Sequence, residues 1–182
     1  MRSADAVRYD ATMNPTNPMR WQRDGFAIDT DPARLDVDVI HAFLAASYWA
    51  EGIPRAVVER SIAGALCFGI YDQRDAARPR LAGFARVVTD RATVAYLGDV
   101  FVLEEYRGRG LSSWLMECID AHPDLQGLRR WVLLTRDAHG LYRKFGWTSI
   151  AKPDRYMERW DPAAYKPKGV PAASHADTEP RA

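Results

Sequence analysis

The chain has 182 residues, of which 47% are hydrophobic and 27% are charged, and its formal net charge is +1. This length and composition suit one globular domain with a hydrophobic core, and the near-neutral charge argues against a global attraction to nucleic acid or to an anionic membrane. The sequence has no window of about 18 apolar residues, and its N-terminus lacks the apolar run of a signal peptide, so we expect a cytoplasmic protein.

The two ends of the sequence differ in composition from its middle. Residues 1–18 are polar and rich in turn formers, and residues 167–182 are rich in Pro, Ala and charge, so we predict that both are flexible. The folded domain is predicted at residues 19–166. Cys67 and Cys118 match no metal-ligand spacing, and their apolar surroundings favour buried thiols over a disulfide.

Hydrophobic periodicity and turn residues divide the domain into strands and helices. In chain order we predict a strand at 26–31, helices at 36–47 and 54–66, strands at 67–72, 80–90 and 94–104, a helix at 110–122, a strand at 129–135, a helix at 137–145, and closing strands at 148–151 and 155–160. This order predicts an α+β fold whose central sheet carries helices on both faces.

A glycine-rich turn joins the predicted strand at 94–104 to the helix that follows it. Gly108 and Gly110 remove side chains near the helix start, and Arg107 and Arg109 add guanidinium groups suited to phosphate. The unbonded N–H groups of a helix start attract anions. The pattern therefore predicts an anion-binding cradle, although it also fits an ordinary strand-to-helix turn with solvated arginines.

Two motifs in this part of the chain resemble those of the GCN5-related N-acetyltransferase (GNAT) family. The first is Arg-Gly-Arg-Gly-Leu-Ser at 107–112, where the family has Arg/Gln-x-x-Gly-x-Gly/Ala and where Ser112 takes the place of the usual Gly or Ala. The second is Leu-Tyr-Arg-Lys-Phe-Gly-Trp at 141–147, which matches Leu-Tyr-x-x-x-Gly-[Phe/Trp]. Thr135 stands where the family often has an asparagine.

The resemblance implies both a fold and a co-substrate. The sheet would be mixed and mostly antiparallel, and the strands at 94–104 and 129–135 would splay apart to form the acyl-CoA cleft. Acetyl-CoA would be the co-substrate, and no metal ion would be needed. The residues implied to bind acetyl-CoA are Phe101 and Val102, through their backbone groups, and Arg107, Gly108, Arg109, Gly110, Leu111 and Ser112.

Acetyl transfer to an amine requires two proton movements. An alkylammonium group with a pKa of about 10 must lose a proton before it attacks, and the departing thiolate benefits from a proton donor. The resemblance implies that Tyr142 is this donor; the alternative is a core tyrosine packed beside Leu141 and Phe145. Asp99, which the splay would leave facing the cleft, is the candidate base, directly or through a water, unless it merely caps a bulge. His139 is a rival base that we expect to be exposed.

In the family, the segment between the first two helices forms one wall of the acceptor pocket. Here that segment contains Tyr48, Trp49 and Glu51, which suit a cationic amine on a small apolar or aromatic body, although they could also simply close the first helix at the surface. We therefore expect an N-acetyltransferase with a small-molecule primary amine as acceptor and no nucleic-acid or membrane partner. The alternative is a non-catalytic acyl-CoA-binding sensor or interaction module. A homodimer contact through Trp160 is a further expectation.

Overall fold

The computed structural model describes residues 18–166, so residues 1–17 and 167–182 of the predicted flexible ends lie outside the described residues. The described chain forms a six-stranded sheet in which the strands keep their sequence order. The strands are β1 (Arg20–Arg23), β2 (Phe26–Asp29), β3 (Leu66–Asp72), β4 (Arg80–Thr89), β5 (Val94–Val102) and β6 (Arg130–Leu133). Neighbouring strands are antiparallel except β5 and β6, which are parallel. The predicted mixed, mostly antiparallel sheet is therefore confirmed.

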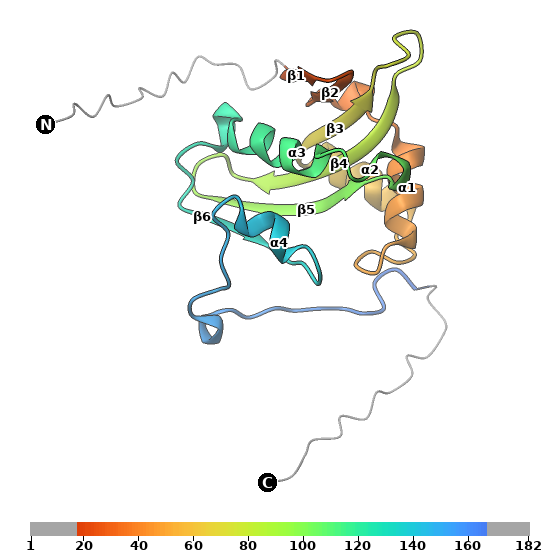
Figure 1. The fold of residues 1–182 in the computed structure, drawn as a ribbon. Helices are drawn as coiled ribbons and strands as arrows, with labels where there is room; N and C mark the ends of the chain where they lie inside the picture. The colour runs from red at the N-terminus through yellow and green to blue at the C-terminus, as the bar shows by residue number, and fades with distance from the viewer. Residues whose placement is uncertain (1–17, 167–182) are drawn as a thin grey trace, which may run out of the picture.

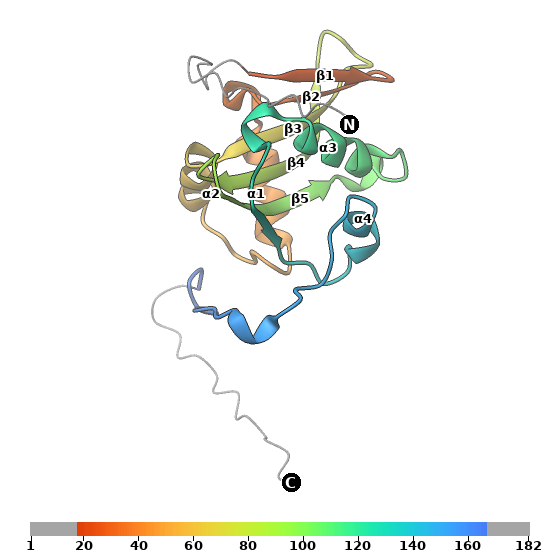
Figure 2. The same ribbon diagram turned by 90° about the vertical axis from the view of Figure 1, so that its left-hand side faces the viewer.

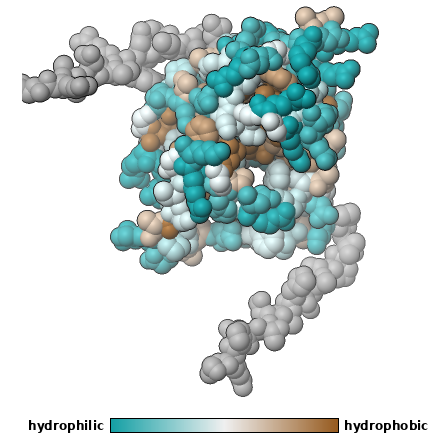
Figure 3. All heavy atoms as spheres, in the orientation of Figure 1, coloured by the Kyte–Doolittle hydropathy of each residue, from teal (hydrophilic) through white to brown (hydrophobic). Residues whose placement is uncertain are grey.

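The helices cover both faces of this sheet. Within the described chain the α-helices are α1 (Val37–Ala46), α2 (Arg55–Ala63), α3 (Leu111–Asp120) and α4 (His139–Arg143). The first two pack on one face and the last two on the other, so each face has its own hydrophobic core, as predicted (Figures 1 and 2). The outer surface is mostly hydrophilic in the view of Figure 3, with hydrophobic residues toward its middle. Every helix among residues 18–166 is too short or too polar to traverse a lipid bilayer.

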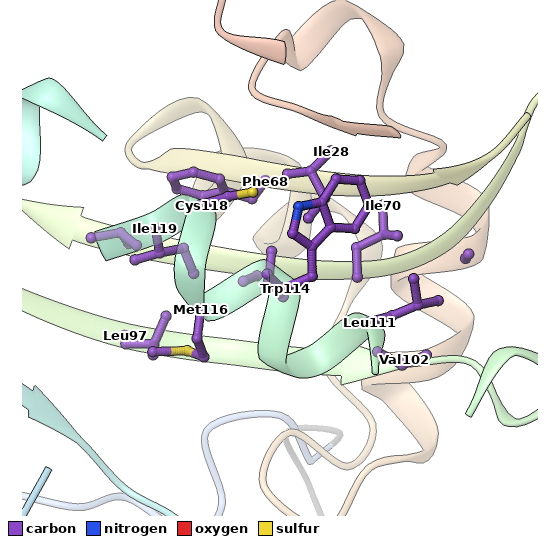
Figure 4. Packing of buried hydrophobic residues seen from close by; sticks show 14 of the residues in the cluster. Ile28, Phe68, Ile70, Leu97, Val102, Leu111, Trp114, Met116, Cys118 and Ile119 are labelled. Atoms are coloured by element: carbon purple, nitrogen blue, oxygen red, sulfur yellow. The ribbon is translucent and has the colours of Figure 1, made fainter. Parts of the chain in front are cut away.

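Helix α3 positions the glycine-rich turn that precedes it. One face of the helix is buried against the sheet (Figure 4) and consists of Leu111, Trp114, Leu115, Met116, Cys118 and Ile119. Burial of a large apolar side chain contributes roughly 1.5–3 kcal/mol, so these residues hold the helix firmly against the strands. Leu111, at the helix start, shares a buried cluster with Val102, the last residue of β5. The turn between the two is therefore anchored at both of its ends.

Strand β5 extends beyond its parallel partner. The pairing with β6 runs from Val94 opposite Arg130 to Leu97 opposite Leu133, whereas β5 continues to Val102. Among the described strands, none lies beside residues 98–102 on the β6 side. This confirms the predicted splayed pair and leaves one edge of β5 open to hydrogen bonds from a bound molecule.

The closing strands predicted at 148–151 and 155–160 do not form, and this prediction was wrong. The segment contains a 3-10 helix at Pro153–Arg155 and no strand. Pro153 has no N–H group to donate to a ladder. Met157 is 99% exposed, so the apolar residue in the middle of the alternating segment 155–160 does not pack against a core. Strand propensity reflects pairing and packing against a neighbouring strand. Arg130 of the edge strand β6 donates to the hydroxyl of Tyr156, but the described segment forms no ladder with β6.

The first strand, β1, was not predicted because its sequence, Arg-Trp-Gln-Arg, is mostly polar. It pairs with β2 through a turn in which Asp24 and Gly25 have φ angles of 51° and 78°. Two positive φ angles are those of a type I′ hairpin turn, for which Asp-Gly is a preferred sequence. The Asp-Gly pair was thus the signal that could have revealed the strand.

Candidate active site

A β-bulge interrupts β5 where its pairing with β6 ends. Phe84 on β4 pairs with Phe101, but Arg86 pairs with Gly98, so two residues of β5 lie opposite one residue of β4. Within the bulge, Asp99 has the left-handed conformation, with φ of 55°. Aspartate tolerates this conformation better than most residues. A non-glycine residue held in such a conformation often marks a functional site.

Asp99 forms an ion pair with Arg86 on the neighbouring strand. Nε of Arg86 donates to Oδ2 of Asp99 over 2.7 Å, and the two side chains are only 19% and 13% exposed. A carboxylate in a strand core is thereby satisfied by a charged partner rather than left unpaired. Sequence reasoning missed Arg86, although a single arginine within the apolar run Leu-Ala-Gly-Phe-Ala-Arg-Val-Val was a visible signal.

Gly98 has a packing role beside this ion pair. A Cβ atom at Gly98 would lie 2.9 Å from Cε1 of Tyr96, two residues earlier on β5. The missing side chain therefore lets the Tyr96 ring fold over the strand next to Asp99. Burial and the Asp99 carboxylate both raise the pKa of Tyr96, in that order, so its phenol stays protonated at neutral pH.

Tyr142 lies on the short helix α4 and is buried among the residues that pack under α3. Burial, followed by the electrostatic influence of Tyr48, Asp137 and Tyr96, raises the pKa of Tyr142 to about 12. The phenol therefore keeps its proton at neutral pH and can donate a hydrogen bond. Two other tyrosines lie on elements beside α4: Tyr48 accepts a hydrogen bond from the N–H of Arg136, three residues before the helix, and Tyr96 pairs with Val132 on β6.

The glycine-rich turn forms a pocket at the other end of the open β5 edge. Its volume is about 100 Å³, and its lining residues are Val102, Tyr106, Arg107, Gly108, Gly110, Leu111, Ser112 and Ser113. Of the residues predicted for the cradle turn, only Arg109 does not line this pocket. Phe101 is likewise not in the lining, and its carbonyl oxygen points toward Gly83 on β4.

The backbone of the turn leaves donors free at the start of α3. Gly108 and Gly110 have φ angles of 74° and 75°, which only glycine adopts without strain. Gly110 is the N-cap residue of α3 and supplies no side-chain cap, so the first-turn N–H groups face the pocket without a capping acceptor. Nε of Arg107 donates to the carbonyl oxygen of Val102 over 3.1 Å, which ties the turn to the end of β5.

The loop after α1 forms an aromatic wall on the face of the sheet that α1 and α2 cover, opposite the face that carries α3. Phe43 on α1 stacks on Phe101 at a centroid distance of 3.9 Å. Trp49 lies 6.2 Å from Phe43, and Tyr48 meets Trp49 edge to face at 4.9 Å. Tyr48 and Trp49 remain exposed on their outer sides. Glu51, the third predicted acceptor residue, is exposed and has no ion pair with any residue from 18 to 166.

Arg136 joins this wall to the segment before α4. Its guanidinium carbon lies 3.8 Å from the centroid of the Tyr48 ring, and its backbone N–H donates to the Tyr48 hydroxyl over 3.2 Å. The segment also contains Thr135, whose Oγ1 accepts from the N–H of Ala138 over 3.0 Å and thereby caps the turn that enters α4. His139 is exposed, as expected.

A larger hollow of about 360 Å³ lies at the turn between β3 and β4 and is lined by Asp72, Arg74, Asp75, Arg78 and Arg80. Asp72 and Arg74 pair with each other within the turn. Nη2 of Arg74 donates to Oδ2 of Asp72 over 2.6 Å, and this hydrogen bond is the main cause that lowers the pKa of Asp72 to about 2. We therefore place the chemistry at the splay, where protonated phenols and free backbone donors meet, rather than in this larger hollow.

Comparison with known proteins identifies the family of the chain. The sequence model described as "Acetyltransferase (GNAT) domain" matches residues 63–149, which include the bulge, the cradle and Tyr142. A protein of Gibberella zeae named "Putative acetyltransferase" is 33% identical over 150 residues, which are 72% of this chain and 84% of that protein. The chain belongs to the GNAT acetyltransferase family.

Solved structures of GNAT proteins resemble the whole described domain. A GNAT-family protein of Xanthomonas campestris, described as a putative acetyltransferase, superposes with a TM-score of 0.74 at 48% identity, covering 80% of this chain and 100% of that one. A GNAT acetyltransferase of Elizabethkingia anophelis, solved with acetyl-CoA bound, has a TM-score of 0.53 at 13% identity over 77% of this chain and 91% of that one. At that identity, the second likeness concerns the fold alone.

Proposed function

We propose that this GNAT protein transfers the acetyl group of acetyl-CoA directly to a primary amine of a small molecule. One observation carries the proposal. The open edge of β5, residues 98–102, has the cradle of free N–H groups at one end and the buried phenol of Tyr142 near the other. A thioester that carries phosphate groups needs an anion-binding site and a hydrogen-bond donor near its leaving sulfur, and the two lie toward opposite ends of this edge.

The residues around the cradle suit the pyrophosphate of acetyl-CoA. The uncapped N–H groups at the start of α3 and the positive end of its dipole attract anions, and Gly108 and Gly110 admit a phosphate close to the backbone. Nothing lies within 4 Å of a Cβ built at either glycine, so the approach is open. Arg107 and Arg109 add positive charge beside it. The E. anophelis protein shares this fold and was solved with acetyl-CoA bound, which supports acetyl-CoA as the acetyl donor.

Tyr142 would donate a hydrogen bond to the departing sulfur. A phenol whose pKa is about 12 is a weaker acid than a thiol, whose ordinary pKa is about 8.5, so full proton transfer is uphill. The phenol therefore acts mainly by stabilising negative charge on the sulfur as the C–S bond breaks. Placement in a buried environment strengthens that hydrogen bond.

Asp99 would help the amine to lose its proton, either directly or through a water. Its Oδ2 atom is engaged by Arg86, so a proton placed on this carboxylate would disrupt the ion pair. We favour a water that carries the proton away while the carboxylate attracts the ammonium group. The Tyr48–Trp49 wall would bind the apolar part of the acceptor on the same face of the sheet.

The test is release of free thiol from acetyl-CoA in the presence of a panel of primary amines, with mass spectrometry of the acetylated product. Amine-dependent release and an acetylated amine would support transfer. Tight CoA binding without release from any amine would instead indicate the alternative, a sensor or interaction module of the same fold.

A further inference from the structure

Arg86 lies on the acceptor face of the sheet, just beyond the cover that α1 and α2 provide. Phe84, two residues earlier on β4, is buried in the core beneath these helices. Val88, two residues later, is 42% exposed, and its cross-strand partner Tyr96 is 37% exposed. Since alternate residues of a strand share a face, Arg86 lies at the boundary between the covered and the open part of the sheet.

The cross-strand neighbours of Arg86 are small. Cys67 on β3 and Gly98 on β5 lie opposite Arg86, and the ring of Tyr96 lies over Gly98, so Tyr96 borders the site beside the guanidinium group. The thiol of Cys67 is buried, and burial raises its pKa to about 12, so it stays neutral. Asp99 is the carboxylate that Arg86 meets.

Most hydrogen-bond donors of Arg86 remain available. A guanidinium group has five N–H donors, and the bond to Asp99 uses the one on Nε. Neither Nη atom bonds to a residue from 18 to 166, and neither is among the buried nitrogen atoms that lack a partner there. Both Nη atoms therefore keep some exposed surface and carry N–H donors that a molecule on this face can use.

These donors lie close to the reacting centre. The ring of Tyr96 lies against Gly98, which pairs with Arg86 and precedes Asp99, and Tyr96 itself pairs with Val132 on β6, the strand before α4 and Tyr142. The aromatic wall adjoins the same place, because Phe101 follows Asp99 by two residues and stacks on Phe43. An acceptor whose amine is near Tyr142 can therefore place another group at Arg86.

We propose that Arg86 binds a carboxylate of the acceptor, so the acetyl acceptor is a small zwitterion that carries both a primary amine and a carboxylate. The inference rests on the proposed function and names the acceptor class of that site. The outer edge of a guanidinium group matches a carboxylate with two parallel hydrogen bonds. The free oxygen of Asp99 attracts the ammonium group, so the neutral ion pair complements a neutral zwitterion.

A carboxylate fits this site better than a phosphate group. The positive charge of Arg86 is already balanced by Asp99 at 2.7 Å. A second carboxylate with one negative charge is tolerated beside this pair, whereas a phosphate dianion would be repelled more strongly by Asp99. The proposed phosphate site is the cradle, with its helix start and Arg107, and it lies at the far end of the open β5 edge.

The test compares each amino acid with the amine left by its decarboxylation. Phenylalanine and phenethylamine, lysine and cadaverine, and β-alanine and ethylamine form such pairs, and 2-aminoethylphosphonate distinguishes phosphonate from carboxylate. We expect kcat/KM to be about 10- to 150-fold higher for the amino acid than for its decarboxylated partner, which is the factor that one hydrogen bond to a charged group typically contributes. The Arg86→Gln variant should remove this preference and leave the acetyl-CoA KM unchanged.

A second variant guards against misfolding, since Arg86→Gln leaves Asp99 without its partner. The variant Arg86→Lys keeps a positive charge beside Asp99 but lacks the planar fork of a guanidinium group, so it should stay folded and show a reduced preference for the amino acid. Equal kcat/KM for the members of each pair in the wild-type protein would overturn the inference but leave the proposed function intact. Transfer to none of these compounds would overturn both. A higher kcat/KM for 2-aminoethylphosphonate than for β-alanine would show that the site prefers a phosphonate to a carboxylate and would overturn the proposed acceptor class.

Discussion

The substitution Gly110→Asp should abolish tight CoA binding while the protein stays folded. Gly110 has φ of 75° and open space where a Cβ would lie, so aspartate strains the backbone but meets no neighbouring atom. The left-handed conformation costs about 1–2 kcal/mol for a residue with a Cβ and less for aspartate. We expect a fall in Tm of a few degrees, as for about 1 kcal/mol in a domain of this size.

The loss of affinity should be much larger than the loss of stability. The new carboxylate lies at the start of α3, where it repels phosphate and competes for the uncapped N–H groups. A hydrogen bond to a charged group contributes about 1.5–3 kcal/mol. Loss of two such bonds weakens binding by about 3 kcal/mol or more, which is over a hundredfold in Kd. Isothermal titration calorimetry with CoA measures this change directly.

Gly127→Asp is the matched control for this experiment. Gly127 has φ of 71° and also has nothing within 4 Å of a built Cβ, but it lies in the loop beyond the far end of α3. It should reproduce the fall in Tm without changing CoA affinity. If a folded Gly110→Asp protein bound CoA as tightly as Gly127→Asp, the assignment of the cradle would be refuted.

Three other predictions follow from the site and the core. Tyr142→Phe should lower kcat by about 10²–10⁴-fold with little change in CoA affinity; a kcat within twofold of the wild-type value in steady-state assays would return Tyr142 to a packing role. Trp49→Ala and Glu51→Gln should each raise the acceptor KM far more than the acetyl-CoA KM, and unchanged acceptor KM values would remove this loop from the pocket. Burial lowers the pKa of His122 below its ordinary value of 6.5. As the pH falls, His122 therefore takes up a proton in the unfolded chain before it does so in the folded one. The free energy of unfolding should thus keep its full value above pH 6.5 and decrease below it. Urea unfolding at pH 7.5 and 5.5 should show this loss, and His122→Asn, which keeps an acceptor for the N–H of Asp124, should reduce it; an equal loss in that variant would assign the pH dependence to other groups.

Elements with local signals were predictable, and those that need a distant partner were not. The amphipathic pattern of α3 and the glycines before it specify a helix start by themselves, because capping and backbone conformation depend on neighbouring residues only. The strands predicted at 148–151 and 155–160 had an equally plain pattern, but neither pairs with the outer edge of β6, and neither forms. Sequence alternation cannot supply the second strand of a pair.

The same division applies to the candidate site. The sequence by itself determined the conformation of the cradle, since Gly108 and Gly110 permit positive φ angles that other residues resist. Only the tertiary structure decided that Asp99 pairs with Arg86, because the partner of a bulged residue depends on the register of β4 against β5. It also brought Tyr48 to Arg136, 88 residues away. Contacts of that separation arise when both cores of the sheet are packed, and no local pattern in the chain encodes them.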